Sequence, residues 1–270
     1  MKVLKIVTLF NIKGGIGKTS LTSLIAYKLA NEGKKILIID ADLQANMTQF
    51  MYKSNHTDKT IVNAIRDNTT AEELIIKAPN NNYPGVDLIP ADIELCVLAE
   101  HMALDKNKNK LVALWFRNNL EVFKTYDYIF VDLSPSIDLL NRNFLYICDS
   151  IIVPINHGDL ASIRGAELFN ILYLQEAKKL GFGANTKIAL LKNCNKKYNR
   201  KMLHLFDEQL QKYKFSREHL LETSISESTT IQQAVLMRTG LEDLEKKYKN
   251  KKIQEQIDDI VIELKSKEII

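Results

Sequence analysis

The sequence predicts an α/β fold, in which a mostly parallel sheet carries helices on both faces. Short apolar runs rich in β-branched residues alternate along the chain with longer segments whose apolar residues recur at helical spacing. The run Lys35–Asp40 is almost continuously hydrophobic, which is typical of a strand covered on both faces. An alternation of this kind is built from βαβ units, and such units give a parallel sheet.

Seven apolar runs are expected to form the strands of this sheet. In chain order they are Leu4–Phe10, Lys35–Asp40, Val86–Ile89, Tyr128–Asp132, Ser150–Ile155, Thr186–Leu191 and Leu221–Ile225. The clearest helical patterns lie at residues 21–29, Lys110–Phe123, Leu139–Ile147, Ile163–Leu180 and Arg200–Tyr213. We expect the polar segment Asn55–Asn82 to form a helical excursion with loops. Because no repeat, low-complexity tract or linker interrupts the pattern, residues 1–270 are expected to form a single domain.

The composition indicates a globular protein of a reducing compartment. The chain has 270 residues, of which 46% are hydrophobic and 26% charged, enough for one sizeable core. Cys96, Cys148 and Cys194 form no CxxC pair, so we expect buried thiols in a cytosolic protein and neither disulfides nor zinc. No apolar run has the length of a membrane span, and no signal peptide is evident. A net charge of +4 is compatible with a nucleic-acid partner without indicating one.

A glycine-rich segment between the first strand and the first helix carries the strongest functional signal. It reads Asn11-Ile12-Lys13-Gly14-Gly15-Ile16-Gly17-Lys18-Thr19-Ser20. Glycines let the backbone turn tightly and direct its N–H groups at phosphate oxygens, and the following helix adds the positive end of its dipole. Lys18 would place a charge at the β- and γ-phosphates, and the Thr19 hydroxyl is placed to ligate magnesium. The segment therefore predicts a triphosphate-binding loop.

This loop resembles the deviant Walker A motif of the ParA/MinD family of ATPases. The common pattern GxxxxGK[ST] fails because Ile12 stands at its first glycine, and the chain carries KGGxGK[ST] instead. The resemblance implies a P-loop NTPase fold of SIMIBI-like architecture, with ATP bound by residues 13–20. It also makes Lys13 the family's signature lysine, which reaches across a dimer interface to the partner subunit's nucleotide. A second cation there stabilises charge in the transition state, so Lys13 and Lys18 are catalytic candidates.

Two acidic segments are expected to complete the site, because the carboxyl ends of parallel strands share one edge of a sheet. The run from Asp40 to Asn46 resembles the family's DxDxQxN segment, although many members have proline where Leu43 stands. By that resemblance Asp42 orients or activates the attacking water, while Asp40 helps to hold the magnesium shell and the loop hydroxyl. Asp132 resembles the Walker B aspartate and would join Thr19 and Asp40 at the magnesium ion. The alternative without such a role is that the aspartate pair caps the next helix.

Basic residues near the C-terminus are the candidates for DNA binding, which the resemblance implies. Non-specific binding needs only phosphate neutralisation by lysine and arginine. The first cluster is Lys196, Lys197, Arg200 and Lys201, and the second is Lys246, Lys247, Lys249, Lys251 and Lys252. Either cluster could also be a solvated helix face. A basic contact that family members often carry is missing, because the chain reads Ile225-Ser226-Glu227 at that place.

The resemblance implies an ATP-dependent DNA partition ATPase with weak intrinsic activity. ATP and Mg²⁺ would close two copies into a homodimer that binds non-specific DNA, and a ParB-type centromere-binding protein would stimulate hydrolysis. Such a protein would be cytoplasmic and nucleoid-associated, without membrane binding. The chain begins at its first strand, so we expect no N-terminal operator-binding domain. Family strands also resemble the runs at Leu88–Ala91 and Ser150–Ile155, with Gly165 opening a helix after the second.

Two other functions remain open at this point. A MinD-like membrane switch would need a basic amphipathic tail. The tail has an apolar stripe of Ile253, Ile257, Ile260, Val261 and Leu264, but its other face carries Glu255, Asp258, Asp259 and Glu263. We therefore expect this helix to pack on the domain. A metabolic ligase of the dethiobiotin-synthetase type would usually lack the equivalent of Lys13. An iron–sulfur reductase is disfavoured because residues 133–143 contain no cysteine.

Overall fold

The computed structural model describes residues 4–270 except 54–57, 82, 184, 196–199 and 238–251. Its described part contains one seven-stranded sheet in the order β3-β2-β4-β1-β5-β6-β7, with every pairing parallel. The strands are β1 Lys5–Leu9, β2 Ile36–Ala41, β3 Val86–Ile89, β4 Tyr128–Leu133, β5 Ser150–Asn156, β6 Lys187–Asn195 and β7 Leu220–Ser226. All seven predicted strands are confirmed, and β6 runs on beyond its predicted end at Leu191.

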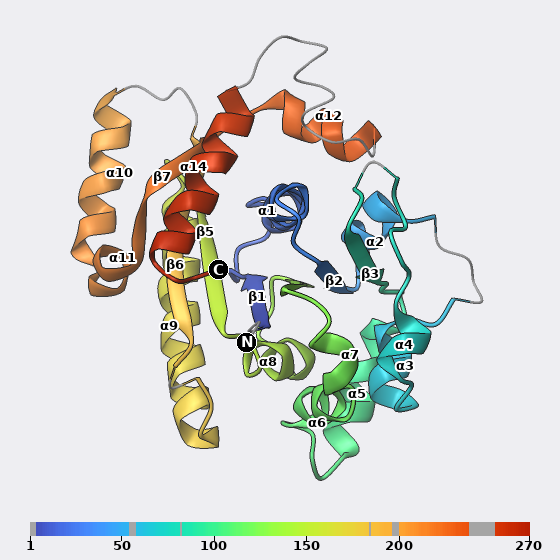
Figure 1. Ribbon diagram of the computed structural model, residues 1–270. Helices are drawn as coiled ribbons and strands as arrows, with labels where there is room; N and C mark the ends of the chain where they lie inside the picture. Colours follow the sequence, from blue (N-terminus) through green and yellow to red (C-terminus); the bar gives the residue numbers. More distant parts are fainter. Residues whose placement is uncertain (1–3, 54–57, 82, 184, 196–199, 238–251) are drawn as a thin grey trace.

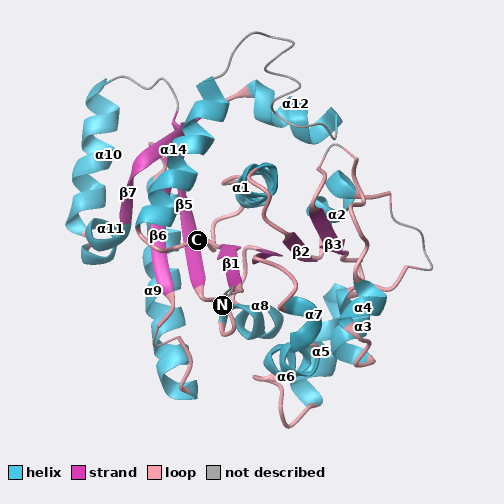
Figure 2. Cartoon of the chain, viewed as in Figure 1, coloured by secondary structure: helices cyan, strands magenta, loops and turns pink. Residues whose placement is uncertain are grey.

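Helices cover both faces of the sheet, as predicted (Figures 1 and 2). One face carries α1 Lys18–Asn31, α2 Asn46–Met51, α12 Thr229–Met237 and α14 Lys252–Ser266. The other carries α3 Ile61–Arg66, α4 Ala71–Leu74, α5 Leu95–Leu104, α6 Leu111–Asn118, α7 Leu120–Phe123, α8 Leu139–Leu145, α9 Leu160–Leu180, α10 Arg200–Lys212 and α11 Lys214–His219. Each face buries its own apolar cluster, which explains why the strands are apolar on both sides.

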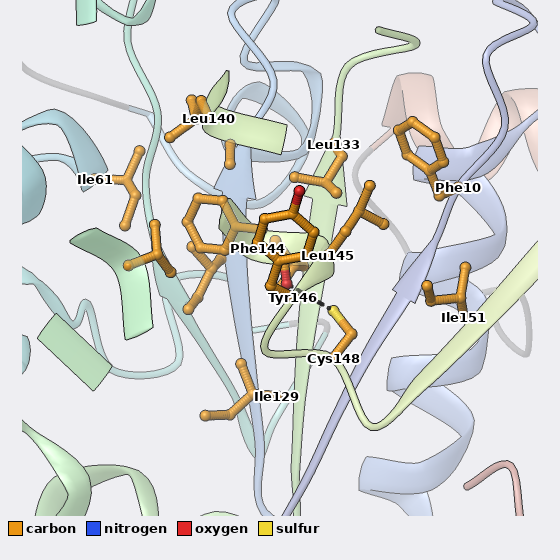
Figure 3. Close-up of a cluster of buried hydrophobic side chains, with 14 of the residues drawn as sticks. Phe10, Ile61, Ile129, Leu133, Leu140, Phe144, Leu145, Tyr146, Cys148 and Ile151 are labelled. Atoms are coloured by element: carbon orange, nitrogen blue, oxygen red, sulfur yellow. Dashed lines mark hydrogen bonds between the residues drawn. The ribbon is translucent and has the colours of Figure 1, made fainter. Parts of the chain in front are cut away.

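Part of the second cluster lies directly behind the functional edge of the sheet. Figure 3 shows four members of this cluster: Phe10, which directly follows β1, Leu133 of β4, Phe144 of α8 and Ile151 of β5. The Phe10 ring also packs on Phe169 of α9, with 5.0 Å between ring centroids. This layer is fully buried, so it fixes the points at which the chain leaves β1 and β4.

The cysteines match the sequence prediction only in part. Cys148 is buried, its Sγ donates to the Phe144 carbonyl at 3.2 Å (Figure 3), and burial raises the pKa of its thiol. Cys96, however, is exposed on α5, so the prediction of a buried thiol was wrong there. Leu95, Leu98 and Met102 take the core-facing stripe of that helix, and position 96 falls outside that stripe. The side chain of Cys194 lies outside the described part.

Two other segments show how packing modifies a local pattern. The helix predicted over Lys110–Phe123 is divided into α6 and α7 at Asn119. The Asn119 amide donates to the Trp115 carbonyl at 2.9 Å and accepts from the Ala71 N–H at 2.8 Å, which ties the break to α4. The polar segment after residue 55 contains α3 and α4, as expected for a helical excursion. In α14 the predicted apolar stripe is buried against the domain, which confirms that the tail packs on the sheet.

Candidate nucleotide-binding site

The sheet brings the predicted loop and the predicted carboxylates to one edge. β4 lies between β1 and β2, and Asp132 is paired in register with both Leu9 and Asp40. The chain leaves β1 into the glycine-rich loop, leaves β2 toward Asp42, and leaves β4 just after Asp132. Three separate sequence segments therefore meet at the carboxyl edge of three adjacent parallel strands, where open α/β sheets bind their ligands.

The loop leaves backbone N–H groups free at the start of α1. Gly15 and Gly17 have φ values of 70° and 81°, which a residue with a Cβ rarely adopts. Gly17 is the N-cap of α1, and within the described residues no side chain caps that terminus and no acidic residue stands in the first turn. The first N–H groups of a helix have no partner inside the helix. They are therefore available to phosphate oxygens, together with the positive end of the helix dipole.

A cleft of about 680 Å³ opens in front of this loop. Its walls are Gly14, Gly15, Ile16, Gly17, Lys18, Thr19, Ser20, Ser23, Asp42, Gln44, Asn46, Gln49, Phe50 and Pro135. The volume falls within the range of small-molecule and cofactor sites. Every residue predicted to bind the nucleotide lines this cleft except Lys13. Lys13 is exposed on the same loop.

Asp132 is a buried carboxylate that has no hydrogen-bond partner among the described residues. It is fully buried, and neither of its oxygens accepts a hydrogen bond. Burial raises the pKa of Asp132 well above its usual value, and the charge of Asp40 raises it further. The Thr19 hydroxyl lies close enough to lower that pKa, and Lys18 lowers it less. A buried carboxylate without a partner is costly, so this position is suited to a cation.

Lys18 and Asp40 both interact with the Asp132 carboxylate, but their own hydrogen bonds and pKa shifts differ. Burial lowers the pKa of Lys18, while Asp132 and Asp42 oppose that shift, and its ammonium donates to the Lys13 carbonyl at 3.4 Å. Asp40 is fully hydrogen-bonded: it accepts from the Thr48 N–H and hydroxyl, both at 2.8 Å, and from the Asp42 N–H at 3.1 Å. Burial nevertheless raises the pKa of Asp40 to about 6, against these hydrogen bonds.

These residues fit a magnesium–nucleotide complex. Among the described residues no group of three or more acidic, histidine or cysteine side chains could hold a metal ion unaided. Magnesium does not require such a cage, because it usually binds one or two carboxylates together with substrate phosphates and water. The unpartnered oxygens of Asp132, beside the Thr19 hydroxyl, provide such an incomplete set. Asp40 already uses its oxygens on Thr48 and Asp42, so its predicted magnesium role stays a prediction. Bound magnesium would neutralise phosphate charge.

Asp42 is placed for the role predicted from its position after β2. It is almost fully buried and lines the cleft, and one carboxylate oxygen accepts from the Gln44 N–H at 3.0 Å. That hydrogen bond leaves oxygen lone pairs available to orient a water molecule. The water-activating role of Asp42 stays a prediction.

One buried asparagine and one glycine support the loop from behind, a role that their sequence positions did not predict. The Asn11 amide donates to the carbonyls of Pro154 and Ser162 at 2.9 and 3.1 Å, and its oxygen accepts from the Lys13 N–H at 3.0 Å. A Cβ added at Gly165 would lie 2.4 Å from the Asn11 oxygen. Gly165 lies inside α9, which begins at Leu160 under an Asp159 cap, so the prediction that it opens the helix was wrong.

The predicted DNA-binding residues lie mostly outside the described part. Lys196 and Lys197 precede α10, in a segment that is not described. Arg200 and Lys201 are the first residues of α10, but the description does not extend to their side chains. Of the second cluster, only Lys252 is described, exposed at the start of α14. The DNA-binding residues stay predictions. In the described ranges no helix combines the length and apolarity needed to cross a bilayer.

The fold and this loop define a P-loop ATPase of the deviant Walker A type. A family model described as an AAA domain matches residues 4–190. The cell division protein PomZ of Myxococcus xanthus is 32% identical over 160 residues, which are 58% of this chain and 48% of PomZ. The sporulation initiation inhibitor Soj of Bacillus subtilis is 31% identical over 172 residues, 63% of this chain and 65% of Soj. The matches span about half to two thirds of these relatives. The chain belongs to this AAA-domain family and, within it, to the ParA/MinD ATPases.

Solved structures have the same architecture. The ATP complex of McdA from Cyanothece superposes with a TM-score of 0.82, covering 97% of this chain and 96% of McdA at 18% identity. That likeness concerns the fold alone. A structure from Borrelia burgdorferi B31 bound to AMPPNP, described as a plasmid partition protein, gives a TM-score of 0.67 at 27% identity, covering 84% of this chain and 88% of that chain. These comparisons confirm the predicted fold class and family.

Proposed function

We propose that the chain is an ATP-dependent DNA partition ATPase that works as a dimerisation switch. ATP and Mg²⁺ bind at residues 14–20, and two copies close face to face so that each Lys13 reaches the nucleotide of the partner. The closed dimer binds non-specific DNA through basic residues that include Lys196, Lys197, Arg200 and Lys201. A ParB-type partner stimulates hydrolysis through Asp42, after which the dimer opens. The protein would then be cytoplasmic and associated with the nucleoid.

One observation carries the dimer part of this proposal. Lys13 is exposed, while every other predicted nucleotide-binding residue lines the cleft of its own chain. The Asn11 oxygen fixes the Lys13 N–H, so the backbone at this lysine is held in place. A cation carried on a fixed backbone and open to solvent is available to a second molecule. Supplied in trans, it makes hydrolysis depend on dimerisation, as an arginine finger does.

The decisive experiment measures molar mass by light scattering with ATP and Mg²⁺. Asp42→Ala should bind ATP, hydrolyse it more slowly and persist at twice the 30.9 kDa of one chain. Adding Lys13→Ala should return this variant to the monomer with ATP still bound. Lys124→Ala is the matched control, because Lys124 is an exposed lysine that forms a local ion pair with Glu121. A monomeric Asp42→Ala protein saturated with ATP would refute the sandwich dimer.

The same variants separate partition from the alternatives. If the proposal is right, the ATP-bound dimer co-sediments with non-specific duplex DNA, and its affinity falls steeply with salt. Stimulation of hydrolysis by DNA and a centromere-binding protein supports partition. Stimulation by a small metabolite would instead support a ligase. The MinD-like alternative requires an exposed tail stripe, and in α14 that stripe is buried. If the protein floated with anionic vesicles in the presence of ATP, that result would support the MinD-like alternative.

A further inference from the structure

A side chain from a distant strand holds the middle of the phosphate loop. Asn193 lies on β6, which β5 separates from β1. Its amide donates to the Ile16 carbonyl at 2.6 Å, across 177 positions of sequence, and its side chain is buried. A Cβ added at Gly17 would lie 2.6 Å from the same amide nitrogen. The amide thus occupies the space that a side chain at position 17 would need.

This hydrogen bond determines which way one peptide unit of the loop faces. The peptide between Ile16 and Gly17 is planar and trans, so its carbonyl and its N–H point in opposite directions. Because the Ile16 oxygen is held toward Asn193, the Gly17 N–H points away from β6. Gly17 and Ile16 line the cleft. The opposite orientation would aim a carbonyl oxygen at the phosphates, which would repel them.

The sheet interior fixes Asn193 independently of the loop. Asn193 is in register with Asn156 of β5, and its carbonyl accepts from the His157 N–H at 3.0 Å. Gly17, in contrast, can exchange between backbone conformations at low cost because it lacks a Cβ. A rigid donor therefore faces a flexible peptide.

We propose that Asn193 is a positioning residue of the phosphate loop, which selects the peptide orientation that turns the Gly17 N–H toward bound phosphate. The role deepens the nucleotide-binding part of the proposed function and is independent of dimerisation and DNA binding. It concerns the phosphates and makes no use of the base. Loss of the Asn193 donor should therefore weaken any ligand that carries the same phosphate chain.

The test replaces the amide by a carboxylate of the same size, Asn193→Asp, in the full chain. Isothermal titration calorimetry in the presence of Mg²⁺ then compares the affinity for AMPPNP with the affinity for inorganic tripolyphosphate. Loss of a buried hydrogen bond and repulsion of the Ile16 oxygen predict about a 10- to 100-fold weaker affinity. The loss should be the same factor for both ligands. Should Asn193→Asp fail to fold, Asn193→Ala, which removes the donor without adding charge, carries the same comparison.

A matched control separates positioning from general destabilisation. Asn119→Asp makes the same chemical change at another buried amide that donates to a backbone carbonyl, at the junction between α6 and α7. It should lower the melting temperature and leave both affinities unchanged. Equal affinity losses in the two variants would overturn the proposal. A loss for AMPPNP alone would mean that Asn193 recognises the nucleoside and would also overturn it, as would unchanged affinity for both ligands. If light scattering instead shows a monomer with ATP bound, that result refutes the proposed dimer and leaves the role of Asn193 untouched.

Discussion

Replacing Asp132 by asparagine should make the nucleotide-free protein more stable and its magnesium site weaker. Asp132 is buried, and its two oxygens accept no hydrogen bond from the described residues. Burial and the neighbouring Asp40 raise its pKa. At pH 8 the folded protein therefore holds either a destabilised charge or a proton that the unfolded chain would release. An asparagine side chain has nearly the same volume as an aspartate and carries no charge that must be desolvated.

The size and pH dependence of this gain follow from the burial of the group. Relief of a buried, unpartnered charge is worth about 1–3 kcal/mol, and a protein of this length gains roughly 2 °C in melting temperature per kcal/mol. A carboxyl whose pKa is raised on folding binds more protons in the folded state, so its contribution to stability falls as pH rises above about 4. The Asp132→Asn gain should therefore be near zero at pH 4 and greatest at pH 8.

Thermal unfolding of the nucleotide-free protein at pH 4.5, 6 and 8 measures this gain, and Asp40→Asn is the matched control. The Asp40 carboxylate accepts three hydrogen bonds from Thr48 and Asp42, so its amide variant should lose stability. AMPPNP binding is also measured once with Mg²⁺ and once with EDTA. The gain in affinity that Mg²⁺ gives the unchanged protein should be lost in the Asp132→Asn variant. A lower melting temperature at pH 8, or a gain that is the same at all three pH values, would refute the reasoning.

Two further substitutions test the loop and its support. Gly165→Ala places a methyl group 2.4 Å from the Asn11 oxygen and should cost about 1–3 kcal/mol of stability by overpacking. It should also weaken AMPPNP binding because Asn11 holds the Lys13 N–H, and an unchanged dissociation constant would contradict this link. Lys18→Ala removes the cation beside Asp132 and should reduce affinity at least about 100-fold, given the strength of charge-assisted phosphate contacts. Binding within about threefold of the unchanged protein would exclude Lys18 from the phosphate site.

The sheet was predictable because its signal is local. Most strands contain a short apolar run, and a strand such as Ile36–Ala41 is buried at every position. The division between α6 and α7 was not predictable in this way. Asn119 breaks the helical pattern while accepting from the Ala71 N–H, a partner 48 positions away in the sequence. Cys96 shows the same limit, because an apolar residue type does not state which side of its helix faces the core.

The residues of the site also fall into two groups, those that a local sequence pattern predicts and those that depend on long-range contacts. The glycine pattern and Lys18 act through the local backbone, so their motif identifies the phosphate loop from sequence alone. Asn11 and Asn193 act through contacts with β5, α9 and the loop itself. Their residue type carries no signal, since a single asparagine in a strand or loop is common. Only the order β1-β5-β6 in the sheet brings Asn193 to the loop.

The chemistry of the two sides of the loop differs, and the difference has a physical reason. Behind the loop, Asn11 and Asn193 are neutral amides that hold backbone groups. In front of it, the ionisable residues Lys18 and Asp42 line the cleft, and the buried carboxyl of Asp132 interacts with both. A charged group behind the loop would change the potential at the phosphates and compete for the same N–H groups or cation. Neutral supports fix the loop without altering that potential. The loop conformation should therefore be insensitive to salt and pH, whereas occupancy by magnesium and phosphate should follow the protonation of the buried carboxylates.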